Sequence, residues 1–271
     1  MAEVPRHRAA DPGQGLVAAA IEAELVALGA SLGRPVEVAQ TTPSTNDDAK
    51  RAADEGAPHG AAFLADSQTH GRGRGKNEWH SPGGQNLYLS VVLRPELDPA
   101  ATAPLALAAG VSVAQVVDAL LPTPRAMLKW PNDVYVDERK LAGVLVEATS
   151  RPGRAPVVVI GVGLNVLTER FPAWIAPEAT SLTLAGAQDL DRNIVAARLI
   201  HALGEVTRVY EKRGVAALID ELTRRDFLRG RTLEVGKVAG TGEGIDAQGR
   251  LVVRGADGGI HAVCSGEVRW Q

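Results

Sequence analysis

Residues 127–148 have the sequence MLKWPNDVYVDERKLAGVLVEA, in which short apolar runs are separated by polar turn residues. The runs are Met127–Trp130, Val134–Val136 and Leu141–Ala148, and a fourth run, Val157–Val162, follows shortly after them. Short apolar runs bounded by turn residues are typical of sheet strands joined by tight links. The stretch therefore predicts consecutive sheet strands with hairpin connections.

On both sides of this stretch the apolar residues recur at helical spacing or form further short runs. We expect helices at Asp11–Leu32, Asp47–Glu55, Ala103–Leu121, Asn193–Lys212 and Val215–Arg225. Ser44 and Asp47 have the spacing of a helix-capping pair. We expect additional strands at Val36–Ala39, Ala61–Ala65 and Leu87–Leu93.

The last forty residues have no helical periodicity. Their apolar runs are Thr232–Val235, Leu251–Val253 and Ile260–Val263, linked by glycine-rich turns. The sequence predicts an α+β fold in two parts. Residues 1–229 would form a domain with a mixed or antiparallel sheet and helices on one side, and residues 230–271 a small all-β domain.

The composition is that of a soluble globular protein. The chain has 271 residues, 45% of them hydrophobic, and its 29 Lys and Arg against 32 Asp and Glu leave a net charge of -3. This balance argues against a protein that mainly coats nucleic acid or an anionic membrane. The single cysteine, Cys264, excludes an intrachain disulfide.

The sequence contains no stretch typical of a membrane span or a secretion signal. The most apolar early segment, Leu16–Leu32, is interrupted by Glu22 and Glu24 and is shorter than the ~20 apolar residues that a spanning helix needs. We therefore expect a cytoplasmic protein without membrane contact.

Residues 69–76, THGRGRGK, place three cations on a glycine-rich backbone. Such a loop can surround phosphate oxygens with guanidinium groups and backbone N–H groups. Two alternatives are a solvated basic turn and a nucleic-acid contact. The common phosphate motifs do not match, because a Walker loop requires other residues than His70 and Asn77, and the dinucleotide motif requires glycine where the chain has Lys76.

Three further segments contain polar or glycine residues at strand ends. Residues 129–133, KWPND, contain an Asn-Asp pair that either orients a ligand or simply forms a turn. In residues 139–143, RKLAG, Lys140 enters an apolar strand, where it either faces a cleft or is a surface residue. Residues 161–165, GVGLN, indicate close backbone approach or a bulged strand.

Taken together, these segments resemble the catalytic domain of bacterial biotin protein ligases, over roughly residues 38–185. The matching pieces, in chain order, are Ser44-Thr45-Asn46, Gln68 with Gly71-Arg72-Gly73-Arg74 and Trp79, SPGGQNLYLS at 81–90, KWPND, RKLAG and GVGLN. The resemblance extends more loosely to residues 265–268. It implies a class II synthetase-like catalytic domain followed by an SH3-like β-barrel.

The resemblance also implies an activity. A biotin protein ligase activates biotin with ATP to biotinyl-5'-AMP, releasing pyrophosphate, and then transfers biotin to a lysine of a biotin carboxyl carrier protein. Mg²⁺ would accompany the ATP. The family's DNA-binding members carry an additional N-terminal module, and since only about 35 residues precede the first expected strand, we expect a ligase of the monofunctional type without specific DNA binding. It would act as a monomer or a homodimer.

Site residues carry over from the resemblance position by position. The biotin pocket would be lined by Ser44, Thr45, Asn46, Gln68, Gly71, Arg72, Gly73, Arg74, Lys140, Gly143, Leu145 and Gly161. ATP would contact Arg74, Trp79, Asn132, Lys140 and Asn165, with Asp133 on the metal side. The chain departs from the family pattern at Lys76 and Asn77, where the family commonly has Gly and Arg.

The chemistry independently requires cations, because a carboxylate and ATP are both anions and charge develops on the α-phosphate. Arg72, Arg74 and Lys140 would provide these cations as the catalytic residues. Neighbouring carboxylate and phosphate groups favour the charged form of Lys140, so we expect it to stabilise charge and not to act as a nucleophile.

Two rival functions fit parts of the sequence. A lipoate or octanoate protein ligase or transferase would share the general fold, but the KWPND and GRGR segments together favour biotin. A nucleic-acid-binding module would use the arginine loop and the β tail, yet an aromatic content of 4% is low for a base-stacking surface.

Overall fold

The structure is a computed structural model that describes residues 15–96, 101–149 and 156–271. Its centre is a seven-stranded sheet with the strand order β1-β2-β3-β7-β6-β5-β4. The strands are β1 (Val36–Thr42), β2 (Ala62–Gln68), β3 (Leu87–Leu93), β4 (Met127–Lys129), β5 (Asp133–Val136), β6 (Arg139–Thr149) and β7 (Val157–Leu164). Only β1 and β2 pair in parallel, so the sheet is mixed, as predicted.

The predicted run of hairpins, β4-β5-β6-β7, is confirmed by consecutive antiparallel pairing. The turn between β5 and β6 consists of Asp137 and Glu138, whose φ angles of 50° and 60° are those of the turns that favour two-residue hairpins. Arg125 binds both carboxylate oxygens of Asp137, at 2.9 and 3.1 Å, and Arg231 binds Glu138 at 2.6 Å. Two arginines therefore stabilise a backbone conformation that residues other than glycine rarely adopt.

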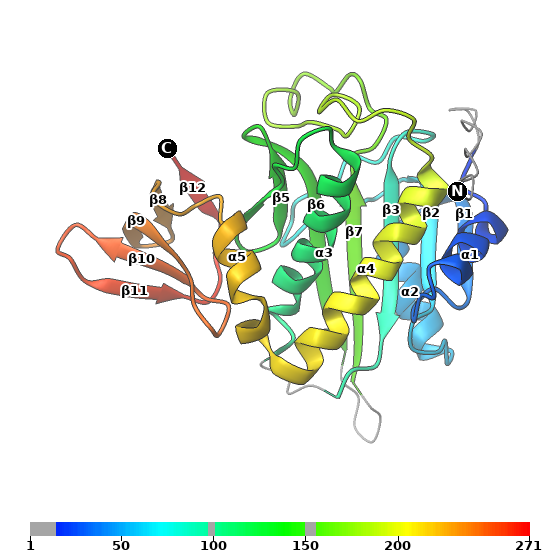
Figure 1. The fold of residues 1–271 in the computed structure, drawn as a ribbon, viewed down its shortest axis with the longest axis horizontal. Helices are drawn as coiled ribbons and strands as arrows, with labels where there is room; N and C mark the ends of the chain where they lie inside the picture. Colours follow the sequence, from blue (N-terminus) through cyan, green and yellow to red (C-terminus); the bar gives the residue numbers. More distant parts are fainter. Residues whose placement is uncertain (1–14, 97–100, 150–155) are drawn as a thin grey trace, which may run out of the picture.

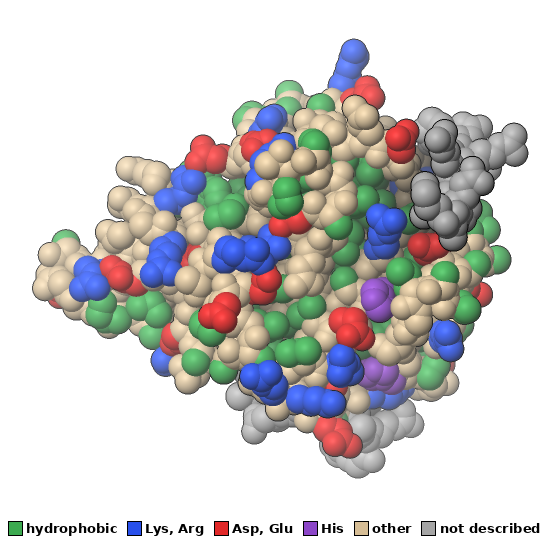
Figure 2. All heavy atoms as spheres, in the orientation of Figure 1, with side chains coloured by type: hydrophobic (Ala, Val, Ile, Leu, Met, Phe, Trp, Pro, Cys, Tyr) green, Lys and Arg blue, Asp and Glu red, His purple; other side chains and the backbone are tan. Residues whose placement is uncertain are grey.

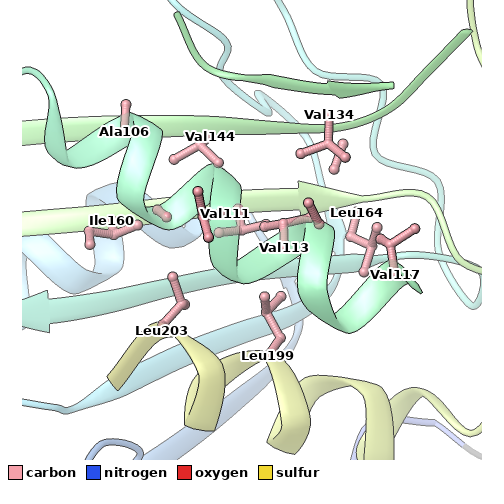
Figure 3. Packing of buried hydrophobic residues seen from close by; sticks show 14 of the residues in the cluster. Ala106, Val111, Val113, Val117, Val134, Val144, Ile160, Leu164, Leu199 and Leu203 are labelled. Carbon is pink, nitrogen blue, oxygen red and sulfur yellow. The ribbon is translucent and has the colours of Figure 1, made fainter. Parts of the chain in front are cut away.

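One face of the large sheet is covered by α1 (Ala18–Ala27), α3 (Leu105–Leu120) and α4 (Arg192–Arg213), which lie in front of it in Figure 1. Their apolar faces bury the main core. One buried cluster contains Val113 of α3, Ile160 and Leu164 of β7, and Leu199 and Leu203 of α4 (Figure 3). Burial of these aliphatic side chains, at ~25 cal/mol per Å² of apolar surface, drives the association of these helices with the sheet.

The fourth long helix of this part, α2 (Thr45–Asp54), packs against the opposite face of the sheet. Its Ala49 and Ala53 form a second buried cluster with Phe63 of β2 and Val159 of β7. The expectation of helices on one side thus holds for α1, α3 and α4 but not for α2. Alternating strand residues contribute to the two clusters, which is how a sheet separates its faces.

Helix ends differ from the predicted ones for local reasons. Gly29 has a φ of 64° and ends α1 before Leu32, while the expected start at Asp11 lies outside the described residues. Ser44 is the N-cap of α2, but its side chain makes no capping hydrogen bond, so the predicted capping pair is wrong. Residues 215–225 form a 3-10 turn, Val215–Leu218, followed by α5 (Ile219–Arg225), and not one helix.

The C-terminal residues form a second, antiparallel sheet of five strands with the order β11-β10-β9-β8-β12. The strands are β8 (Thr232–Val235), β9 (Val238–Ile245), β10 (Leu251–Gly255), β11 (Ile260–Val263) and β12 (Val268–Trp270). The sequence did not indicate β9, because it is rich in glycine. A Cβ atom at Gly240 would lie 2.0 Å from the carbonyl oxygen of Arg254, so the close approach of the neighbouring strand requires glycine there.

Aromatic and polar contacts join the C-terminal sheet to the first part of the chain. The guanidinium of Arg231 lies over the rings of Phe227, at 4.2 Å, and Trp270, at 4.7 Å. The indole N–H of Trp130 donates to the carbonyl of Gly249 at 2.9 Å. Since Arg231 also binds Glu138, the hairpin that leads into Lys140 contacts the C-terminal sheet.

The surface is mixed in charge. On the face shown in Figure 2, Lys and Arg side chains are interspersed with Asp and Glu. No helix in the described part of the chain combines the length and the apolar character needed to cross a membrane.

The contribution of the buried ion pair between Arg225 and Asp118 to stability can be tested by mutation. Arg225 is buried, with a side chain 8% exposed, and binds Asp118, Glu221 and the carbonyl of Ala126. Replacement by methionine leaves Asp118 without this partner, and we expect the free energy of unfolding in urea to fall by about 3–5 kcal/mol.

The neighbouring Arg224, whose side chain is 64% exposed, is the matched control. Arg224→Met should leave the urea midpoint unchanged. Equal destabilisation by the two substitutions would show that the buried ion pair contributes no more to the free energy of unfolding than the exposed one.

Candidate functional site

A cavity of about 710 Å³ lies on the sheet face opposite to α1, α3 and α4. Its walls come from the start of α2, the arginine loop (residues 71–79), the 129–133 link, the loop around Trp174, and the C-terminal turn (residues 265–268). β6 and β7 form its floor, through Gly143, Leu145, Gly161 and Gly163. Segments that are far apart in the sequence therefore share one concave surface, as expected of a ligand site.

The glycines of the floor allow two side chains to lie directly on the strands. A Cβ atom at Gly161 would be 2.0 Å from Oδ1 of Asn46, and one at Gly163 would be 2.4 Å from the indole of Trp79. The sequence signal for close backbone approach at 161–165 is explained by these contacts. Neither Asn46 nor Trp79 could occupy its position if a larger residue stood beneath it.

Trp79 provides an aromatic surface inside the cavity. Nζ of Lys140 lies 5.4 Å from the centre of its ring, within cation–π range. The indole nitrogen is buried, and it has no hydrogen-bond partner among the described residues. Buried Trp N–H groups usually have a partner, so this unpaired donor against β7 is unusual.

Lys140, Arg74 and Lys129 are among the cations that line the cavity. Nζ of Lys140 is 2.7 Å from Oδ1 of Asp133. Arg74 donates to the carbonyl of Gly266 at 2.9 Å and has no carboxylate within ion-pair distance among the described residues. Burial lowers the pKa of Lys129 below its ordinary value, although the carboxylate of Asp133 opposes the shift. The cavity therefore has the charge to bind an anion.

Arg72 also lines the cavity, but carboxylates already bind its guanidinium. It contacts Asp47 at 2.8 Å, and both carboxylate oxygens of Glu147, at 3.2 and 2.7 Å. Burial on its own would raise the pKa of Glu147, but hydrogen bonds from Asn46 and Lys50 and the charges of Lys50 and Arg72 outweigh it, so this pKa lies below its ordinary value. These ion pairs with Asp47 and Glu147 thus hold the guanidinium group of Arg72 in place.

The structure brings most of the predicted site residues together. The predicted residues that line the cavity are Ser44, Thr45, Asn46, Gln68, Arg72, Gly73, Arg74, Trp79, Asn132, Asp133, Lys140, Gly143, Leu145 and Gly161. Among them, Asn132 also donates to the carbonyl of Val144 at 2.7 Å, which holds the 129–133 link against β6.

Gly71 and Asn165 lie outside this cavity. Gly71 lines a smaller cavity of about 370 Å³ on the other side of the arginine loop. A Cβ atom there would be 2.4 Å from the carbonyl oxygen of Trp79, so this glycine allows the loop to close on itself. Asn165 is buried and donates to the carbonyl of Thr180 at 2.9 Å.

Several residues at the site were not among those predicted from the sequence. Trp174, 71% exposed, lies at the cavity and packs edge-on against His80. Glu147 contacts Asn46 and Arg72 from β6. Strand alternation carried a signal for Glu147, because it follows Gly143 and Leu145 at the same two-residue spacing. Nothing in the sequence indicated Trp174.

Two family models match the chain. The model described as "Biotin/lipoate A/B protein ligase family" matches residues 38–165. The model described as "Biotin protein ligase C terminal domain" matches residues 229–269, which are the C-terminal sheet.

Curated relatives and solved structures agree with these matches. The biotin--[acetyl-CoA-carboxylase] ligase of Mycobacterium tuberculosis is 37% identical over 83% of this chain and 85% of that protein. The bifunctional ligase/repressor BirA of Escherichia coli is 36% identical over 77% of this chain, and the match spans 66% of the relative's length. The structure titled "Biotin protein ligase from Aquifex aeolicus in complex with biotin and ATP" is similar with a TM-score of 0.78 and 27% identity, covering 88% of this chain and 100% of the other.

The contact between Gly163 and Trp79 can be tested by enlarging the glycine. In Gly163→Ala the new methyl group would overlap the indole, and we expect a loss of about 1–3 kcal/mol in the free energy of unfolding. In a Trp79→Leu background the same substitution should cost less, as measured by a double-mutant cycle in urea. An equal cost in both backgrounds would contradict the contact.

The ion pairs of Glu147 predict a pH dependence. Since its pKa is lower in the folded protein than in the unfolded chain, the folded state binds fewer protons, and stability increases with pH in this window. The contribution is present above the ordinary carboxyl value of ~4.3 and is lost as the pH falls through the folded pKa. We expect the stability difference between wild type and Glu147→Gln, measured in urea, to be larger at neutral pH than at acid pH. A difference that does not change with pH would contradict this.

Proposed function

The chain belongs to the biotin protein ligase family, and we propose that it uses ATP to attach biotin to a lysine of a biotin carboxyl carrier protein. The observation that carries the proposal is the meeting of Arg74 and Lys140, from distant parts of the sequence, at one cavity that is also lined by a polar pocket. The polar pocket, defined by Thr45, Asn46 and Gln68, would take the ring end of biotin.

In the first step an oxygen of the biotin carboxylate attacks the α-phosphorus of ATP. A new O–P bond forms, the bond to the β,γ-diphosphate breaks, and pyrophosphate leaves. Both reactants are anions, so their approach needs positive charge at the reacting atoms. Lys140 and Arg74 are suited to this role, because each has its cationic end at the cavity wall. Lys140 would exchange its contact with Asp133 for a phosphate or carboxylate oxygen.

In the second step the amine of the carrier lysine attacks the carbonyl carbon of biotinyl-5'-AMP. An amide bond forms, AMP leaves with the electron pair of the C–O bond, and the attacking nitrogen loses a proton. The mixed anhydride must be shielded from water until the carrier arrives. The arginine loop supports such shielding, since it borders the cavity and Arg74 joins it to the C-terminal turn.

Trp79 is a suitable partner for the adenine. Its ring lies flat enough on the floor to contact Gly143 and Gly163, and its buried N–H has no partner among the described residues. An aromatic face suits a heteroaromatic base, for which stacking contributes ~1–3 kcal/mol.

The described residues do not form a dedicated magnesium site. They contain no group of three or more His, Cys, Asp or Glu side chains that could hold a metal ion, and Asp133 is occupied by Lys140. Magnesium is commonly bound through substrate phosphates and water with one or two carboxylates. Mg²⁺ would therefore enter with ATP, where it neutralises phosphate charge, and Asp133 is the carboxylate that we propose nearest to it.

The direct test is mass spectrometry of the protein after incubation with biotin, Mg²⁺ and ATP. We expect bound biotinyl-5'-AMP, and biotin transfer on addition of an apo carrier domain. Lipoate in place of biotin serves as the control. Formation of lipoyl-AMP without biotinyl-AMP would favour the lipoate ligase alternative, and absence of any adenylate would contradict the proposal.

Lys140 and its neighbour Arg139 form a matched pair for mutation. Arg139 is exposed on the same strand and does not line the cavity. Lys140→Met should lower the rate of biotin-dependent ATP–pyrophosphate exchange by about 100-fold or more, since charge-stabilising groups contribute on this scale. Arg139→Met should retain the wild-type rate. Similar rates for Lys140→Met and wild type would remove Lys140 from the mechanism.

A further inference from the structure

We propose that Glu147 is a positioning residue that sets the hydrogen-bond polarity of the biotin pocket through Asn46, Ser90 and Thr45. The inference rests on the proposed function, because it concerns the pocket assigned to biotin. Glu147 itself does not line the main cavity, so its effect would be transmitted by the side chains between them.

The first link fixes the amide of Asn46. Its Nδ2 donates to Oε2 of Glu147 at 2.9 Å, and its Oδ1 lies 2.5 Å from the hydroxyl of Ser90. An ionised carboxylate only accepts hydrogen bonds, so Glu147 requires the NH₂ group of Asn46 to face it. The carbonyl oxygen of the amide must then face Ser90.

Two positive groups keep Glu147 in its ionised, accepting form. Lys50 donates to its Oε1 at 3.2 Å, and Arg72 binds both carboxylate oxygens. Charge-assisted contacts of this kind favour the carboxylate over the protonated acid. The ion pairs thus stabilise the ionised carboxylate of Glu147, which is the protonation state that fixes the orientation of the Asn46 amide.

The second link fixes the hydroxyl of Thr45. Ser90 is fully buried and has a single hydroxyl proton, which it must donate to Oδ1 of Asn46 because that oxygen cannot donate. Oγ of Ser90 also lies 2.8 Å from Oγ1 of Thr45. For that contact to be a hydrogen bond, the proton must come from Thr45.

The chain of bonds ends at the cavity wall. The Thr45 hydroxyl also lies 3.3 Å from Oε1 of Gln68, which can only accept, but Ser90 at 2.8 Å is the nearer partner for its single proton. With this proton engaged inside the wall, the Thr45 hydroxyl offers only lone pairs to a ligand, while the backbone N–H of Thr45 donates to Gln68 at 2.9 Å. The amide of Gln68 also has a fixed orientation, because its Oε1 accepts from Thr45 while its Nε2 donates to the hydroxyl of Ser81 at 2.9 Å. The pocket therefore accepts N–H donors at Thr45, and the ureido ring of biotin carries such groups.

Replacing Glu147 with glutamine would remove this restriction. A glutamine side chain both donates and accepts, so Asn46 could rotate its amide and turn Ser90 and Thr45 into the opposite arrangement. The Thr45 proton, released from Ser90, would turn toward Oε1 of Gln68 or toward the cavity, and in the second case it would face an N–H group of the ligand. We expect weaker biotin binding with an unchanged chemical step.

The test measures biotin affinity by calorimetry and the rate of biotinyl-5'-AMP formation at saturating biotin. For Glu147→Gln we expect the dissociation constant of biotin to rise by about tenfold or more, as for a lost hydrogen bond to a buried partner, while kcat and the KM for ATP stay within about twofold. Ser90→Ala interrupts the chain without touching the ion pairs of Arg72 and should give the same split.

Asp47→Asn is the matched control. It makes the same carboxylate-to-amide change at a residue that also binds Arg72 and Lys50, but among the described residues no hydrogen bond joins its side chain to that of the preceding Asn46, so biotin affinity should remain that of the wild type. If Asp47→Asn weakens biotin binding as much as Glu147→Gln does, the effect runs through Arg72 or Lys50 and the inference is overturned.

The other possible outcomes separate a failure of the inference from a failure of the proposed function. A folded Glu147→Gln protein with wild-type biotin affinity would overturn the inference while leaving the proposed function intact. If Glu147→Gln does not fold, Ser90→Ala carries the test, and wild-type affinity in that variant would overturn it. A wild-type protein that binds no biotin would contradict the proposed function and the inference together.

Discussion

The site depends on two glycines of β7, which have no side chains to fill the space above the strand. Gly161 and Gly163 leave the strand bare on the face that α2 covers only in part, and Asn46 and Trp79 lie in the space that they free. The opposite face of the same strand carries Ile160 and Val162 and is packed by the helices. One strand thus combines a buried, stabilising face with a face that holds polar and aromatic groups against its backbone. The cavity exists because these two demands are met by alternate residues.

Much of the fold could be predicted from the sequence, because its strands have a strong apolar pattern. The hairpins from β4 to β7 follow from short apolar runs and turn residues. What the pattern did not contain was tertiary information. Glycine-rich β9 forms a strand only because its neighbours need a close approach, and the position of α2 depends on alanines that pack against Phe63 from the other side. Local sequence does not specify either contact.

The candidate site was predictable to a similar degree. Glycine and arginine motifs led to residues that line one cavity, but they did not separate Arg72 from Arg74. The two arginines are two positions apart, yet one binds Asp47 and Glu147 while the other reaches the C-terminal turn. Their different surroundings come from residues 25, 75 and 192 positions away. Residue type and spacing alone therefore do not distinguish a cation fixed by the protein from one that remains available.

The contact between Arg74 and Gly266 uses a backbone carbonyl as its acceptor. Every residue has such a carbonyl, so mutations in the turn that keep the path of the main chain leave the acceptor in place. The side chains of Cys264 and Ser265 can consequently be replaced without removing the acceptor that joins the loop to the C-terminal sheet. An insertion or deletion of one residue in this turn would displace the oxygen, so the contact constrains the length of the turn more than its composition.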